Sequence, residues 1–170
     1  MVDNNIEIVD IIVPEGKTHF FHPKGNIEII QEKVDSYIRI LEDKGAERIF
    51  FLVDLDTEPC FTSVKSKIPH RANDPIIVCK RALEAWYLAD SEMMSSLLKE
   101  KYICENPEEI NDPFLELKNL LLEKTERGVG DKIILANKVL KEGFTLTKAA
   151  QHQNCLSAKY FIASLQSLHN

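Results

Sequence analysis

The chain has 170 residues, enough for one domain of ordinary size whose core needs neither disulfides nor a structural metal. Its 27 acidic and 21 basic residues give a net charge of −6, which excludes a bulk electrostatic attraction to nucleic acid or to an anionic membrane. No apolar run approaches the roughly 20 residues of a membrane span. The N-terminus also lacks a signal-peptide pattern, so we expect a cytoplasmic protein that does not bind a membrane.

The first part of the chain has the pattern of a strand–helix–strand unit. β-branched residues predict a strand over 6–13. The run RIFFLVD, 48–54, predicts a second, fully buried strand that lies parallel to the first. Between the two strands, spacings of three, four and seven predict a helix ended by Lys44-Gly45, and its apolar face comprises Ile27, Ile30, Val34, Tyr37, Ile38 and Leu41.

The remainder of the chain is predicted to be a loop, a short strand and then helices. A polar loop spans 57–74, and PIIVC, 75–79, is a third strand. The helical segments that follow are marked by a cap at Asp90 or Ser91, a start at Asn111–Pro113, a stop at Gly143 and a cap at Ser157.

These elements together predict an α/β fold with a small parallel sheet, followed by a helical C-terminal part. We expect a single domain over 1–170. Within it, an α/β core covers about 1–104 and a helical extension covers about 105–170.

Two carboxylates stand at the end of the second strand. Asp54 closes the strand and Asp56 follows two residues later, so both side chains can turn toward the same space. Two carboxylates that lie close together repel each other, so they need a cation or a proton. A hard cation such as Mg²⁺ uses one or two carboxylates together with waters and phosphate oxygens. The pair therefore indicates a metal site, although a solvated Asp-x-Asp turn is the simpler interpretation.

Two motifs, LVDLD at 52–56 and LEAWYLAD at 83–90, resemble a bacterial TOPRIM-like family related to OLD-type and RloB-type proteins. The resemblance covers about 45–168. It implies a TOPRIM/Rossmann-like fold that binds Mg²⁺ (or Mn²⁺) and acts on phosphodiesters. By position, Asp54 and Asp56 match the D-x-D motif of the family, and Glu84 matches the glutamate of E-x-W as a third metal ligand.

The residues themselves give Glu84 two interpretations. It opens an apolar helical segment, where an unpaired carboxylate is costly, so a metal ion or a cation such as Arg81 has to compensate it. The simpler interpretation is a surface glutamate beside the core residue Trp86.

The catalytic glutamate of TOPRIM proteins follows their first strand, and here VPEGKTHF at 13–20 offers Glu15 in that place. If the strand over 6–13 is the first of the fold, Glu15 completes the acidic cluster as the general base. If that strand is the second of the fold, the chain lacks this base and is inactive or depends on a partner.

Three functions follow from these residues. The first is a metal-dependent nuclease or phosphodiesterase in which Asp54, Asp56 and Glu15 are catalytic. The second is a degenerate TOPRIM module that binds a partner, for which the resemblance implies an ATPase in a phage-defence pair. The third is a haloacid-dehalogenase-type phosphatase with Asp54 as nucleophile, because Asp54, Asp56 and Thr57 match its D-x-D-x-T motif. For the nuclease, a locally basic loop would hold the phosphate backbone through Lys65, Lys67, His70 and Arg71.

Overall fold

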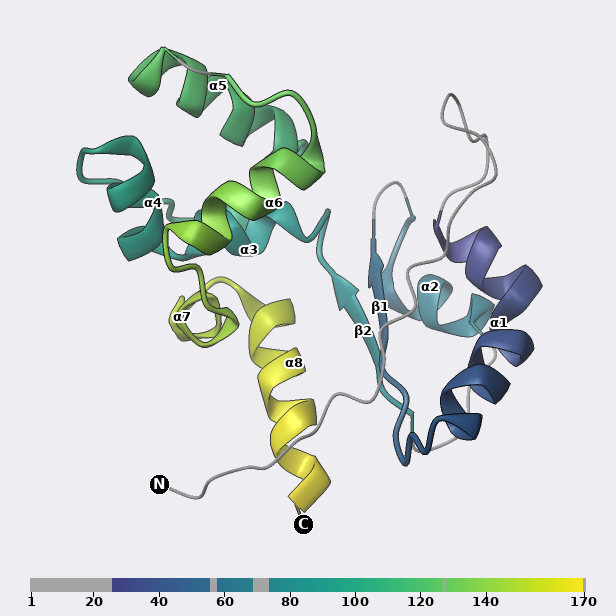
Figure 1. Cartoon of the computed structure of the whole chain (residues 1–170). Helices are drawn as coiled ribbons and strands as arrows, with labels where there is room; N and C mark the ends of the chain where they lie inside the picture. The colour runs from purple at the N-terminus through teal and green to yellow at the C-terminus, as the bar shows by residue number, and fades with distance from the viewer. Residues whose placement is uncertain (1–25, 56–57, 69–73, 127, 170) are drawn as a thin grey trace. The chain divides into compact units, whose positions relative to one another are not determined.

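The computed structural model describes residues 26–55, 58–68, 74–126 and 128–169 (Figure 1). The chain divides into two compact units. We call the part up to Val78 the N-terminal unit and Cys79–Leu168 the helical unit. Among the residues described, no helix has the length and apolar character needed to cross a membrane.

The N-terminal unit packs two helices against a small parallel sheet, and the strand predicted over 6–13 lies outside the described residues. Its elements are α1 (Asn26–Asp43), β1 (Phe51–Asp54), α2 (Phe61–Lys67) and β2 (Ile76–Cys79) (Figure 1). The two strands pair side by side in the same direction, and this mixed α/β character confirms the coarse fold prediction. The shared core comprises Val34, Ile49, Phe51, Val53, Val64, Ile68, Ile76 and Val78.

The end of α1 confirms the stop predicted at Lys44-Gly45. Gly45 has a φ of 89°, a left-handed conformation that glycine adopts without a Cβ penalty. Its N–H donates to the Glu42 carbonyl at 2.8 Å, and the Ala46 N–H donates to the Leu41 carbonyl at 3.0 Å. This is the Schellman arrangement, which satisfies the last carbonyls of the helix and turns the chain toward β1.

Two predictions for this unit were wrong in detail. The strand β1 is not fully buried, because Leu52 is 43% exposed while Phe51 and Val53 on the other face are in the core. The segment predicted as a polar loop contains α2, in which Val64 is buried, and the buried Ile68 follows as its C-cap residue. Its N-cap is the Cys60 thiol, which accepts the Ser63 N–H at 3.4 Å, and cysteine is not among the usual capping residues.

The helical unit contains six α-helices and two 3₁₀ turns among the residues described. They are α3 (Glu84–Ala89), α4 (Ser91–Leu98), η1 (Pro107–Glu109), α5 (Pro113–Thr125), α6 (Lys132–Lys141), α7 (Leu146–Gln151), α8 (Leu156–Gln166) and η2 (Ser167–His169). The centre of this unit is a cluster of buried apolar side chains from α3 to α6, including Leu88, Met94, Leu117, Leu121 and Leu135. All the regular elements described after β2 are thus helices.

Short polar side chains start four of these helices. Asp90, Asp112, Asp131 and Thr145 accept the N–H groups of Met93, Leu115, Ile134 and Lys148, respectively. The caps at Asp90 and at the Asn111–Pro113 start confirm the sequence prediction. Asp90 is buried, and its second oxygen accepts the Thr145 N–H at 3.4 Å, so one carboxylate joins the starts of α4 and α7.

The cap predicted at Ser157 is wrong. The N-cap position of α8 is Cys155, whose side chain makes no capping hydrogen bond, and Ser157 lies inside the first turn. The N–H groups at this helix start donate instead to a carboxylate from η1. The partner of these N–H groups is distant in sequence, so a local pattern does not reveal it.

Candidate functional site

Asp54 occupies the position that the sequence predicts, at the carboxyl end of β1. Successive strand residues point to opposite faces of a sheet, so Asp54 lies on the face of Leu52 and opposite the core residues Phe51 and Val53. The Asp54 side chain is half-buried. Because β2 runs parallel to β1, the carboxyl ends of both strands lie at the same edge of the sheet. Parallel α/β sheets bind ligands at this edge.

The other members of the predicted acidic cluster are not all described. Asp56 and Glu15 lie outside the described residues. Within the described ranges, no group of three histidine, cysteine, aspartate or glutamate side chains is placed to hold a metal ion. Asp54 belongs to the N-terminal unit and Glu84 to the helical unit. The joint metal site of Asp54, Asp56 and Glu84 therefore stays a prediction.

Glu84 is a buried carboxylate at the first position of α3, and only 4% of the residue is exposed. Its Oε1 lies 3.0 Å from the ammonium of Lys132, the first residue of α6. Its Oε2 is buried and has no hydrogen-bond partner among the residues described. Buried polar atoms are normally satisfied, so this oxygen fits a ligand that brings a cation or a donor. The surface interpretation of Glu84 is thereby wrong.

Glu84 also supplies a test of stability. Replacing Glu84 with methionine is expected to raise the free energy of unfolding by about 1–2 kcal/mol, because it removes a buried oxygen that has no hydrogen-bond partner in the described part of the chain. Replacing Lys132 with methionine is expected to lower the same free energy, because it leaves the Glu84 carboxylate without its cation. Urea unfolding of both variants in metal-free buffer measures the two effects. A loss of stability in Glu84→Met would contradict the cost assigned to Oε2.

The described half of the basic loop is partly neutralised. Lys67 and Glu58 form an ion pair, and the Ser63 hydroxyl donates to Glu58 at 3.0 Å. The Lys67 ammonium lowers the pKa of the Glu58 carboxyl. Lys65 and Lys67 both lie in the last turn of α2, whereas His70 and Arg71 lie outside the described residues. The described residues thus offer less positive charge for a phosphate backbone than the sequence suggested.

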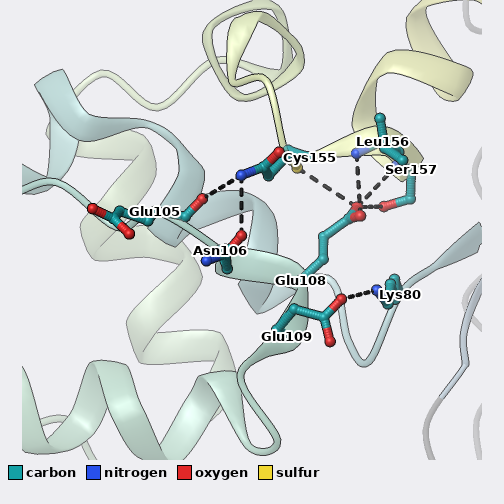
Figure 2. A network of polar contacts seen from close by, with 9 residues as sticks. Lys80, Glu105, Asn106, Glu108, Glu109, Cys155, Leu156 and Ser157 are labelled. Carbon is teal, nitrogen blue, oxygen red and sulfur yellow. Dashed lines mark hydrogen bonds and ion pairs between the residues drawn. The ribbon is translucent and has the colours of Figure 1, made fainter.

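Sequence reasoning missed Glu108, the carboxylate that holds the start of α8 (Figure 2). Glu108 lies in η1 and is 3% exposed. It accepts the N–H of Leu156 at 3.1 Å and the N–H of Ser157 at 2.9 Å. The Ser157 hydroxyl also donates to Glu108, and the indole N–H of Trp86 donates to the Ser157 hydroxyl at 2.7 Å. A negative charge at a helix start also interacts favourably with the helix dipole.

Two neighbouring glutamates in η1 thus have opposite environments. Glu109 is exposed and forms an ion pair with Lys80, which lowers the pKa of its carboxyl (Figure 2). Glu108 is turned toward α8. The three-residue turn with Pro107 at its start presents the two side chains in different directions. The sequence signal for this pair is weak, because Glu-Glu after proline is common at exposed helix starts.

The Glu108 carboxylate also affects the pKa of the Cys155 thiol. Burial raises the pKa of the Cys155 thiol to about 12, and the nearby Glu108 carboxylate acts in the same direction. Thiolates, not thiols, react with alkylating agents. We expect iodoacetamide at pH 8 to modify the exposed Cys60 at least about tenfold faster than Cys155 in the folded protein. Peptide mass spectrometry over time measures both rates, and equal rates in the absence of denaturant would contradict the assignment.

The chain was compared with protein families, curated proteins and solved structures, and no similar protein was found. No protein-family model matches the chain, and no curated protein or solved structure is significantly similar to it. The TOPRIM-like resemblance therefore stays a prediction that depends on its two motifs. The two carboxylates are accordingly described each in its own unit, Asp54 at the carboxyl end of β1 and Glu84 buried at the start of α3.

Proposed function

We propose that this protein is a TOPRIM-like, Mg²⁺-dependent phosphodiesterase that cleaves nucleic acid. The observation that carries the proposal is the position of Asp54, half-buried at the carboxyl end of a strand whose neighbour runs parallel. Asp54 and Asp56 are the proposed metal ligands, and Mg²⁺ prefers such carboxylate oxygens. Glu84 and Glu15 keep the roles that the resemblance implies, as third ligand and general base.

In the proposed chemistry the metal acts on the phosphate and on water, and Asp54 holds the metal in place. When bound, the metal supplies positive charge that stabilises the phosphate oxygens and activates a water molecule. Asp54, at a strand end fixed by packing of Phe51 and Val53, holds one ligand oxygen in place. Rigid support of this kind keeps a ligand within the narrow geometry that Mg²⁺ demands.

The experiment compares metal binding by two aspartate variants. Calorimetric titration of the full chain with Mn²⁺ and with Mg²⁺ is expected to show binding in the wild type and none in Asp54→Asn. The matched control is Asp43→Asn, which makes the same change at an exposed residue at the end of α1 and is expected to bind metal as the wild type does. Absence of metal binding in the wild type would leave Asp54 and Asp56 as a turn and overturn the proposal.

Glu84 needs a separate variant, because its role as a ligand comes from the resemblance. Glu84→Gln is expected to weaken Mn²⁺ binding about 10-fold or more, since losing one carboxylate ligand removes a charged bond to the metal. Circular dichroism of Glu84→Gln before the titration checks that the fold is retained. Unchanged affinity would remove Glu84 from the ligand set and leave the aspartate pair in place.

A further inference from the structure

Glu84 and Lys132 form an ion pair whose two members differ in their exposure to solvent. The Glu84 side chain is 6% exposed, whereas the Lys132 side chain is 58% exposed. Both residues belong to the helical unit, Glu84 at the start of α3 and Lys132 at the start of α6. The buried carboxylate is therefore paired with a cation that solvent reaches, and an exposed lysine can move away at little cost in packing.

The position of Lys132 is unfavourable with respect to its own helix. Lys132 is the first residue of α6, directly after the N-cap Asp131. The start of a helix carries the partial positive charge of the helix dipole, which repels a cation. The lysines in the last turn of α6, Lys138 and Lys141, lie at the end that the dipole favours. The Glu84 carboxylate thus offsets a repulsion that acts on Lys132 and on neither of the other two lysines.

The lysine satisfies only one oxygen of the Glu84 carboxylate. Its ammonium lies 3.0 Å from Oε1, while Oε2 is buried and has no hydrogen-bond partner in the described part of the chain. A buried acceptor without a partner is costly. A divalent cation carries twice the charge of an ammonium and binds a carboxylate through one oxygen or both. Such a cation would therefore stabilise this carboxylate more than the lysine does.

The Lys132 ammonium has a second favourable neighbour in the aromatic ring of Phe114 on α5. It lies 5.9 Å from the centre of that ring. A cation within about 6 Å of a ring centre is attracted by the negative face of the ring. Phe114 is half-buried and packs against the core of the helical unit, so the ring is fixed in place. An ammonium that leaves Glu84 can therefore stay near the ring and return.

We propose that Lys132 competes with the metal ion for Glu84. Its ammonium pairs with the carboxylate in the metal-free protein and moves away when a divalent cation binds. This inference rests on the proposed function, in which Glu84 is the third ligand. The exchange keeps the buried carboxylate paired in both states, which avoids the high cost of an unpaired buried charge. A monovalent cation brings no more charge than the ammonium, so the competition favours divalent cations.

Calorimetric titration of the full chain with Mn²⁺ tests the competition in two variants of Lys132. Lys132→Met removes the competing ammonium and is expected to raise the affinity about tenfold, the effect of one hydrogen bond to a charged group. Lys132→Arg keeps the charge, and its guanidinium can donate to both oxygens of Glu84. The arginine variant is therefore expected to bind Mn²⁺ at least about threefold more weakly than the wild type.

Two controls separate competition for Glu84 from a general effect of charge. Lys138→Met removes the same charge from the last turn of α6 and is expected to leave the affinity within about twofold of the wild type. The double variant Glu84→Gln/Lys132→Met is expected to bind Mn²⁺ as Glu84→Gln does, because without the carboxylate the lysine has nothing to compete for. Circular dichroism before each titration checks that the fold is retained.

The outcomes distinguish this inference from the proposed function. Equal Mn²⁺ affinity of the wild type, Lys132→Met and Lys132→Arg would overturn the competition and leave the metal site of the aspartate pair in place. An equal gain in Lys138→Met and Lys132→Met would also overturn it. The arginine variant keeps a cation beside Glu84, so its comparison with the wild type decides even where Lys132→Met loses its fold. Absence of Mn²⁺ binding in the wild type would overturn the proposed function and this inference together.

Discussion

Replacing Asp54 with asparagine is expected to lower metal-dependent cleavage of a single-stranded oligonucleotide at least about 100-fold, a loss of about 2.7 kcal/mol of transition-state stabilisation. Asparagine has the size of aspartate but lacks the negative charge that would hold the cation. Because Asp54 lies on the face of β1 away from Phe51 and Val53, the change leaves the core of the N-terminal unit intact. The expected loss is therefore one of activity and not of folding.

The measurement is single-turnover cleavage of DNA and RNA oligonucleotides with Mn²⁺ in excess, read on denaturing gels. Asp43→Asn serves again as the matched control, and thermal unfolding of each variant shows whether the fold is retained. Wild-type cleavage that persists in Asp54→Asn would exclude Asp54 as a metal ligand. Metal binding without cleavage of either oligonucleotide would favour a degenerate module that binds a partner.

Replacing Glu108 with alanine is expected to lower the free energy of unfolding by about 3–5 kcal/mol. The change leaves the N–H groups of Leu156 and Ser157 without their acceptor and removes a charge that interacts with the α8 dipole. It also deprives the buried Ser157 hydroxyl of its acceptor, while the Trp86 indole keeps its own. Breaking a buried, fully bonded network at one member is costly because its other members stay buried.

The neighbouring glutamate is a direct control for this loss. Glu109→Ala removes the same side chain one residue later, but Glu109 is exposed and its ion pair with Lys80 lies at the surface. The free energy of unfolding of the Glu109→Ala variant is expected to stay close to that of the wild type. For a chain of this length the Glu108→Ala loss corresponds to a fall in Tm of about 6–20 °C. Equal midpoints for the two variants in urea unfolding would show that Glu108 does not cap α8.

Much of the local structure was predictable from residue type alone. The caps at Asp90 and Asp112, the stop at Gly45 and the packing of Val34, Ile38 and Leu41 along α1 each depend on residues within one or two turns of each other. Local hydrogen bonds and helical periodicity are encoded over such short distances. The placement of Asp54 at a strand end was predictable for the same reason, because an apolar run followed by a carboxylate marks that end.

The helix α2, the burial of Glu84 and the role of Ser157 could not be predicted from local sequence patterns. The helix α2 was missed because its cap is a thiol and Val64 is its one buried residue, which gives no periodic signal. The buried state of Glu84 depends on Lys132, a residue 48 positions later. The role of Ser157 as a first-turn donor and not as an N-cap depends on Glu108, which lies 49 residues earlier.

The sequence by itself therefore determined the end of α1, the starts of α4 and α5, and the aspartate at the end of β1. Those choices follow from backbone capping and from the period of apolar residues. Only the tertiary structure decided how these buried charges are paired among the described residues, Glu108 with the start of α8 and one oxygen of Glu84 with Lys132. The physical reason is that burial and charge pairing arise between segments far apart in the chain, so no local pattern of residues encodes them.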